Sequence, residues 1–254
     1  MNRSSNPVFR SLEKQQVITA DAATSSGVAS KTIILLLVTF ASAALSVIFG
    51  LQLTKSGEGI QVQIDPWLYA LLSIAFVTSF ISVLVATFFP RVAMPFSILY
   101  SLGEGALLGT LTAIINAVIP GVAITALLGV GSIFLVMLFL YTSRTFRVTN
   151  KFRRAMIAGM IAILLTSLFS GILSMIAPAI FARQYLAVAI IVSIVLIIFG
   201  AFMLMLDFDY ADSIVQAGFP KNYEWVAALG FMVTLVWIYV QILRLLILIA
   251  ARRE

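Results

Sequence analysis

Seven apolar stretches of about twenty residues each constrain this chain more than any other feature. A helix of about 20 apolar residues rises about 30 Å, which is the thickness of the hydrocarbon core of a bilayer. Charged residues make up 10% of the chain and apolar residues 62%, too little polarity to cover a water-soluble globule. The sequence therefore predicts an all-α integral membrane protein. The expected spans are residues 32–53, 66–89, 95–116, 120–142, 154–177, 184–206 and 225–250.

The expected organisation is a polar, disordered cytoplasmic tail over residues 1–31, followed by a seven-helix transmembrane bundle over residues 32–251. The cut between the third and fourth spans rests on Pro95 and Pro120, because proline suits the start of a helix better than its middle. A single long kinked helix is the alternative for these two spans.

Lysine and arginine are distributed unevenly between the two sides of the predicted spans. Eleven of the sixteen fall on the side of the N-terminus, which the positive-inside bias places in the cytoplasm. With seven spans the C-terminus is then outside, although Arg252 and Arg253 lie on that side. A re-entrant last helix would remove this conflict. The expected location is a cytoplasmic membrane.

Several classes of function are disfavoured by what the chain lacks. It has no cysteine and no histidine, so thiol nucleophiles, disulfides and the usual zinc ligands are excluded. None of its lysines lies inside a late span, where a Schiff-base cofactor would need one. The net charge of +6 is not gathered into a nucleic-acid-binding module. We expect neither an enzyme nor a resident cofactor.

One charged residue lies deep within the third predicted span. Glu104, in SLGEGALLG, is about 15 Å from the cytoplasmic edge if the helix begins at Pro95. Burying a charge there costs several kcal/mol, so Glu104 is either a protonated, hydrogen-bonded side chain or a titrating group in a permeation path. Small residues recur every four positions beside it, which predicts close packing of two helix backbones. They are Ser97, Ser101, Gly105 and Gly109.

A second acidic cluster, in LMLDFDYADS, ends the sixth predicted span. Asp207 and Asp209 cannot both face the bundle if the helix continues through them, since residues two apart diverge by about 200°. Either the cluster is a hydrated helix end, or one acid has a buried partner. Arg91 is the candidate partner by depth. In the last span Gly230, Thr234 and Gln241 form a narrow small or polar face, with Thr234 near the depth of Glu104.

The order and spacing of four segments resemble the Bax inhibitor motif family, specifically its bacterial branch. These segments are NPVFR, SLGEGALLG, LMLDFDYADSI and EWVAALGFMVTLVWIYVQILRLLILIAARR. The resemblance implies a seven-helix bundle with the last helix central and a pH-sensitive calcium leak through it. It also implies a proton-sensing pair of aspartates, one near the cytoplasmic end of the sixth helix and one in the seventh. Asp207 or Asp209 matches the first, whereas the second falls on Thr234, which is not an acid.

We hypothesise that Glu104 supplies the missing acid. Calcium takes about six to eight oxygen ligands, so Asp209 and Glu104 would form only a weak transit site completed by water and backbone carbonyls. The predicted function is thus a pH-sensitive cation (calcium) leak channel or transporter gated by protonation of intramembrane carboxylates. The alternative is a non-conducting regulator that binds another membrane protein, such as a protease, through its small-residue faces. The sequence predicts the lipid bilayer as a partner but no oligomeric state.

Overall fold

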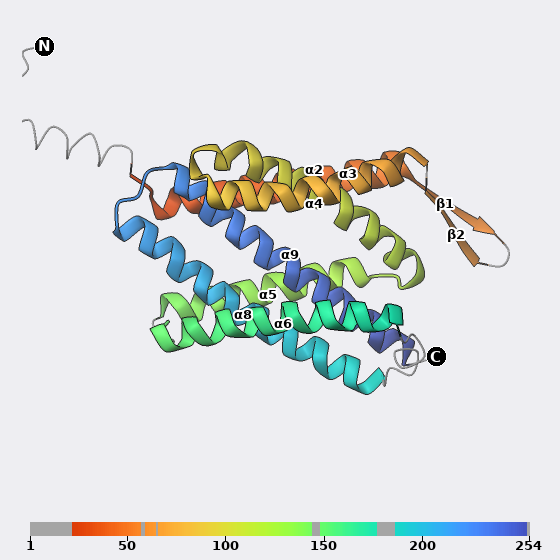
Figure 1. Cartoon of the computed structure of the whole chain (residues 1–254). Coiled ribbons are helices and arrows are strands. Elements are labelled where there is room, and N and C mark those ends of the chain that lie inside the picture. Colours follow the sequence, from red (N-terminus) through yellow and green to blue (C-terminus); the bar gives the residue numbers. More distant parts are fainter. Residues whose placement is uncertain (1–21, 57–58, 65, 144–147, 177–185, 253–254) are drawn as a thin grey trace, which may run out of the picture. The chain divides into compact units, whose positions relative to one another are not determined.

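The computed structural model describes residues 22–56, 59–64, 66–143, 148–176 and 186–252. In these ranges seven helices are long and apolar enough to cross a membrane. They are α2 (Ser25–Gly50), α3 (Pro66–Phe88), α4 (Ala93–Val118), α5 (Val122–Thr142), α6 (Asn150–Ile176), α8 (Leu186–Gln216) and α9 (Asn222–Ala251), as Figure 1 shows. A short 3-10 helix, η1 (Pro90–Val92), precedes α4. The predicted all-α fold with seven spanning helices is confirmed.

The polar tail is shorter than predicted. We expected it to run to Lys31, but α2 begins at Ser25, so residues 25–31 are helical. Thr24 explains the early start, because its Oγ1 accepts a hydrogen bond of 3.0 Å from the backbone N–H of Gly27. A threonine in this position satisfies an amide that the first helical turn would otherwise leave unpaired. Residues 1–21 of the predicted tail lie outside the described residues.

Helix α8 is longer than predicted at its C-terminal end. We placed the end near residue 206, whereas the helix continues to Gln216 and includes all three aspartates of the LDFDYAD segment. The chain leaves the helical conformation at Gly218, two residues after the end of α8, where the φ of +66° is a conformation that favours glycine. The amides of Gly218 and Phe219 donate back to the carbonyls of Val215 and Ile214, each at 3.1 Å. These hydrogen bonds satisfy the last carbonyl groups of the helix. The end of α8 is therefore set by the turn at Gly218 and not by the end of the apolar run.

Helices α4 and α5 are separate, as Pro120 indicated. The backbone reverses at Gly121, with φ of +85°. The side-chain oxygen of Asn116 accepts hydrogen bonds from the amides of Gly121 at 3.1 Å and Ala123 at 3.5 Å. The turn is therefore fixed by one side chain from the end of α4. The alternative of a single kinked helix is wrong.

A β-hairpin, which the sequence analysis missed, follows α2. Strands β1 (Leu51–Ser56) and β2 (Gly59–Ile64) pair antiparallel, with a register from Leu51 opposite Ile64 to Ser56 opposite Gly59. Apolar and polar residues alternate in this stretch, which is the two-residue period of a strand. We had included residues 51–53 in the first span, but the helix ends at Gly50.

The chain divides into two compact units. Of the described residues, the first unit takes 22–111 and 209–232, and the second unit takes 112–208 and 233–252. Helices α4, α8 and α9 therefore contribute residues to both. Burial continues along α9 from Val226 to Leu243, so this helix has buried side chains in each unit.

Small residues bring helix backbones together in the first unit. A Cβ atom at Gly105 would overlap the carbonyl oxygen of Thr39 on α2, and one at Gly109 would lie 2.5 Å from the carbonyl oxygen of Ala43. A Cβ at Gly103 would overlap the hydroxyl of Ser79 on α3. Two hydroxyls of α2 also donate to carbonyls of α4, those of Ser42 to Leu102 at 2.5 Å and of Ser46 to Ala106 at 3.3 Å. Ser97 and Ser101 of α4 are fully buried.

Aromatic rings pack the second unit. Phe208 of α8 contacts Phe134 and Tyr141 of α5, with ring centroids 5.7 Å and 5.5 Å away. Phe199 of α8 meets Trp237 of α9 edge to face at 6.1 Å. Such pairs are favourable when centroids lie about 4.5–7 Å apart. The helices of this unit are thus held together by large side chains rather than by close backbones.

Candidate functional site

Asp207 and Thr234 lie together inside the second unit. Asp207 is on α8 and Thr234 is on α9, and the Thr234 side chain lies beside the Asp207 carboxyl. Thr234 is 8% exposed, and Asp207 Oδ2 is buried without a hydrogen-bond partner among the described residues. An acid with an unused acceptor at this depth gains from binding a proton, a cation or water.

Two other polar side chains of α9 belong to the same unit. Gln241 lies seven residues after Thr234, hence on nearly the same helix face, and its buried Oε1 has no partner in the described chain. The Tyr239 hydroxyl pairs with the Thr112 hydroxyl of α4 at 2.9 Å. The Thr112–Tyr239 pair was not predicted, because neither hydroxyl stands out in an apolar span. Gly230 is half-buried on the small face predicted for this helix.

Asp207 and its neighbouring acids face different surroundings. The helix continues through Asp207, Asp209 and Asp212, so the first two diverge as helix geometry requires. Asp209 and Asp212 belong to the first unit, are half-buried and each have an interaction partner. Asp207 is therefore the acid that combines a position beside Thr234 with a buried oxygen that has no hydrogen-bond partner in the described chain.

Arg91 and Glu104 lie in the first unit. Arg91 is exposed in η1 and makes no ion pair with the residues that the structure describes. Its predicted pairing with an aspartate stays a prediction. Glu104 is half-buried in α4, one turn after the buried Tyr100. The pairing of Glu104 with the site of Thr234 also stays a prediction, because Thr234 belongs to the second unit.

No cluster of three or more acidic side chains suited to a metal occurs in the described ranges. Calcium needs about six to eight oxygen ligands. The weak transit site predicted at Asp209 and Glu104 would thus depend on water and backbone carbonyls for most of its ligands.

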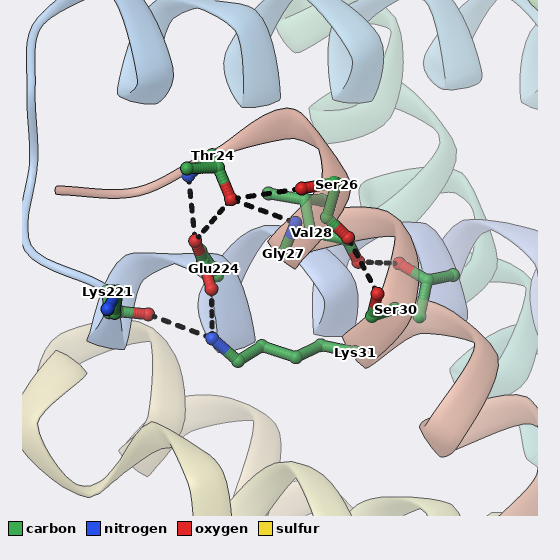
Figure 2. A network of polar contacts seen from close by, with 9 residues as sticks. Thr24, Ser26, Gly27, Val28, Ser30, Lys31, Lys221 and Glu224 are labelled. Carbon is green, nitrogen blue, oxygen red and sulfur yellow. Dashed lines mark hydrogen bonds and ion pairs between the residues drawn. The ribbon is translucent and has the colours of Figure 1, made fainter.

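A polar cluster that the sequence analysis missed joins the starts of α2 and α9 in the first unit. We call it the Glu224 cluster, and it comprises Thr24, Gly27, Lys31, Lys221 and Glu224 (Figure 2). The signal was present as an acid and a lysine, each in the first two turns of a span. It was overlooked because both residues were counted as parts of loops or tails. The contact also indicates that α2 and α9 begin on the same side of the membrane, as the six crossings from the start of α2 to the start of α9 require.

A family model described as Bax inhibitor 1 like matches residues 6–251. This chain belongs to that family. It is accordingly an integral membrane protein of the Bax inhibitor 1 like family, and the resemblance predicted from its four segments is confirmed. No curated protein and no solved structure matches it.

Proposed function

We propose that this Bax inhibitor 1 like protein is a pH-sensitive cation leak, with calcium as the expected ion, gated by protonation of carboxyl groups within the membrane. The observation that carries the proposal is the Asp207 carboxyl, which lies beside Thr234 between spanning helices and has one buried oxygen without a hydrogen-bond partner in the described chain. Family membership over nearly the whole chain supports it.

The proposed gate follows from the cost of a charge at membrane depth. A protonated Asp207 is neutral and can stay beside Thr234 at little cost. When the proton leaves, the carboxylate must attract a cation, gain water or move, because an isolated charge in hydrocarbon costs several kcal/mol. Deprotonation therefore favours either a bound cation or a shift of α8 against α9. Threonine, unlike a second aspartate, adds a hydroxyl but no negative charge to this site.

Glu104 remains the proposed second acid and Asp209 the proposed additional calcium ligand. Both are half-buried on spanning helices of the first unit. Oxygen ligands are those that calcium prefers, and two carboxylates with water make a site weak enough to release its ion. We propose no resident cofactor and no catalytic reaction.

The proposed setting is a bacterial cytoplasmic membrane with the N-terminus in the cytoplasm and the C-terminus outside. The excess of basic residues on the N-terminal side supports this orientation. The length of α9 also supports this orientation. Its 30 residues form one unbroken helix of about 45 Å, which is longer than a segment that enters and leaves the membrane on the same side.

Calcium and proton flux from purified protein in liposomes, measured from about pH 5 to about pH 8, tests the proposal. Asp207→Asn keeps the shape of the side chain but cannot titrate, so we expect the flux to lose most of its pH dependence. Asp212→Asn, on the same helix, is the matched control and should leave the profile unchanged. Glu104→Gln tests the second acid separately.

Two results would contradict the proposal. If Asp207→Asn and Asp212→Asn gave identical pH profiles, Asp207 would not be the gate. If the purified wild-type protein conducted nothing at any pH, the alternative of a non-conducting regulator that binds another membrane protein would be favoured. Co-purification of such a partner from native membranes would then identify it.

A further inference from the structure

The Glu224 cluster surrounds one carboxylate with donors from a segment about 200 residues away. Glu224 Oε1 accepts hydrogen bonds from the backbone amide of Thr24 at 2.7 Å and from its hydroxyl at 3.2 Å. Its Oε2 forms an ion pair with Lys31, whose Nζ also donates to the carbonyl oxygen of Lys221 at 3.4 Å. Figure 2 shows these contacts converging on the first turn of α9.

The cluster is buried and closely fitted. The side chain of Glu224 is 4% exposed and that of Lys31 is 17% exposed. A Cβ atom at Gly27 would overlap the Glu224 carboxylate, so only glycine leaves room for it. The Lys31 ammonium also lies 5.4 Å from the ring centroid of Trp225, a cation–π distance. Removing one partner of a buried ion pair strongly destabilises the folded protein, because the other charge is left buried without a partner.

The backbone reinforces the same connection. Ala22 and Pro220 form an isolated antiparallel β-bridge, and the amide of Ala23 donates to the carbonyl of Phe219 at 2.7 Å. The segment before α2 is thus bonded to the segment before α9 through both backbone and side chains.

Capping α2 does not require Glu224. Thr24 already accepts the amide of Gly27 through its own hydroxyl, which is the usual contribution of an N-terminal threonine. What Glu224 adds is a fixed position for the first turn of α9 relative to α2. Because α9 is one unbroken helix, this also restrains Thr234, ten residues and about 15 Å further along it.

We propose that Glu224 is a positioning residue for the leak: held by Thr24 and Lys31, it fixes α9 in the position in which Thr234 lies beside Asp207. Release of the Glu224 cluster lets α9 shift, separates Thr234 from Asp207 and raises the cation leak. This inference rests on the proposed function for its effect on flux, but the restraint on α9 can be measured without flux.

The first experiment measures amide hydrogen exchange in the full-length protein in lipid nanodiscs. Glu224→Ala and Lys31→Met remove the two partners of the ion pair. Lys151→Met is the matched control, because Lys151 is an exposed lysine in the first turn of α6 outside the cluster. In both cluster variants we expect the exchange protection factors of residues 22–28 and 222–236 to fall about tenfold or more, because a buried ion pair is lost. The control should match the wild type.

The second experiment uses a disulfide to link the segment before α2 covalently to the segment before α9. Ala22 and Pro220 are partners in the bridge at a position without direct hydrogen bonds between them, where Cα atoms lie about 4.5 Å apart and a disulfide can form. The chain contains no cysteine, so Ala22→Cys with Pro220→Cys introduces the only thiols. We expect oxidation to lower calcium flux several-fold and a reductant to restore it, while Glu224→Ala raises flux several-fold.

The outcomes separate this inference from the proposed function. Loss of protection confined to residues 22–28, with 222–236 unchanged, would overturn the positioning role and leave Glu224 a local cap. Coupled loss of protection at both segments, with no flux from any variant or from the wild type, would support the restraint on α9 and overturn the leak. Equal flux from the oxidised and reduced protein, with a conducting wild type, would overturn the link between the restraint and the leak.

Discussion

The helices of the two compact units are held together by different kinds of contact. In the first, glycines bring backbones of α2, α3 and α4 into contact, and serine hydroxyls donate across the contact. In the second, aromatic side chains fill the space between α5, α6, α8 and α9. Close backbones cannot yield to an added atom, whereas rings and methyl groups can change rotamer.

The difference bears on where movement is tolerated. Asp207 and Thr234, which lie beside each other, belong to the second unit, in which helix contacts consist of large, adjustable side chains. The Glu224 cluster belongs to the first, where contacts are short and polar. A gate that must shift is thus expected in the unit whose packing can adapt, and a fixed support in the unit whose packing cannot.

The largest predicted effect comes from filling a backbone contact in the first unit. Gly105→Leu places a whole side chain where even a Cβ overlaps the Thr39 carbonyl, so we expect destabilisation of about 3 kcal/mol or more. Thermal unfolding of the purified protein in detergent measures it. A melting temperature equal to that of the wild type would show that α2 and α4 are not in close contact.

A smaller loss is predicted when one methyl group is added in the second unit. The Cβ of Gly200→Ala would lie 2.7 Å from Ile238 Cγ1 and 2.8 Å from the Trp237 ring, both parts of side chains that can adjust. We expect a cost of about 1–2 kcal/mol. Gly105→Ala is the comparison and should cost more in the same unfolding assay. The reverse order would contradict the distinction between the two units.

Removal of one interhelical hydroxyl should have a smaller effect still. Ser42→Ala deletes the donor to the Leu102 carbonyl, and we expect a loss of about 0.6 kcal/mol, the average for such bonds in membrane proteins. Ser73→Ala is the control, because the exposed Ser73 hydroxyl bonds only within its own helix, to the carbonyl of Tyr69. Equal unfolding free energies for both variants would mean that serines contribute little to the first unit.

The last predicted change, similar in size to that of Ser42→Ala, has the opposite sign. Gly131 of α5 is exposed, and a Cβ there would have no neighbour within 4 Å. Gly131→Ala should therefore stabilise the protein by about 0.5–1 kcal/mol through helix propensity alone. If it destabilised the protein as much as Gly105→Ala does, the glycines of the two units would not differ in the way we infer.

The helices were predictable from hydropathy, whereas helix ends that are set by single polar side chains or by a glycine were missed. Apolar length located all seven helices, and Pro120 located the turn between α4 and α5. The start of α2 was missed because Thr24, which is not an apolar residue, sets it. The end of α8 was missed because the Gly218 stop lies beyond the apolar run.

For the candidate site, the residue types were predictable and the partners were not. Asp207 and Thr234 stand out as polar groups in apolar spans, and the structure joins them. Helix periodicity alone could not tell whether Asp207 or Asp209 would have this partner, since both lie near the same depth. The Glu224 cluster required a contact across about 200 residues, which no local pattern reports.

That separation also bears on how the protein is made. Thr24 and Lys31 leave the ribosome long before Glu224, so the first spanning helix enters the membrane with its lysine unpaired and its first amides incompletely bonded. Only the final helix supplies the missing carboxylate. A nascent chain that stops before residue 222 therefore lacks the acid that neutralises Lys31 and accepts the amide of Thr24.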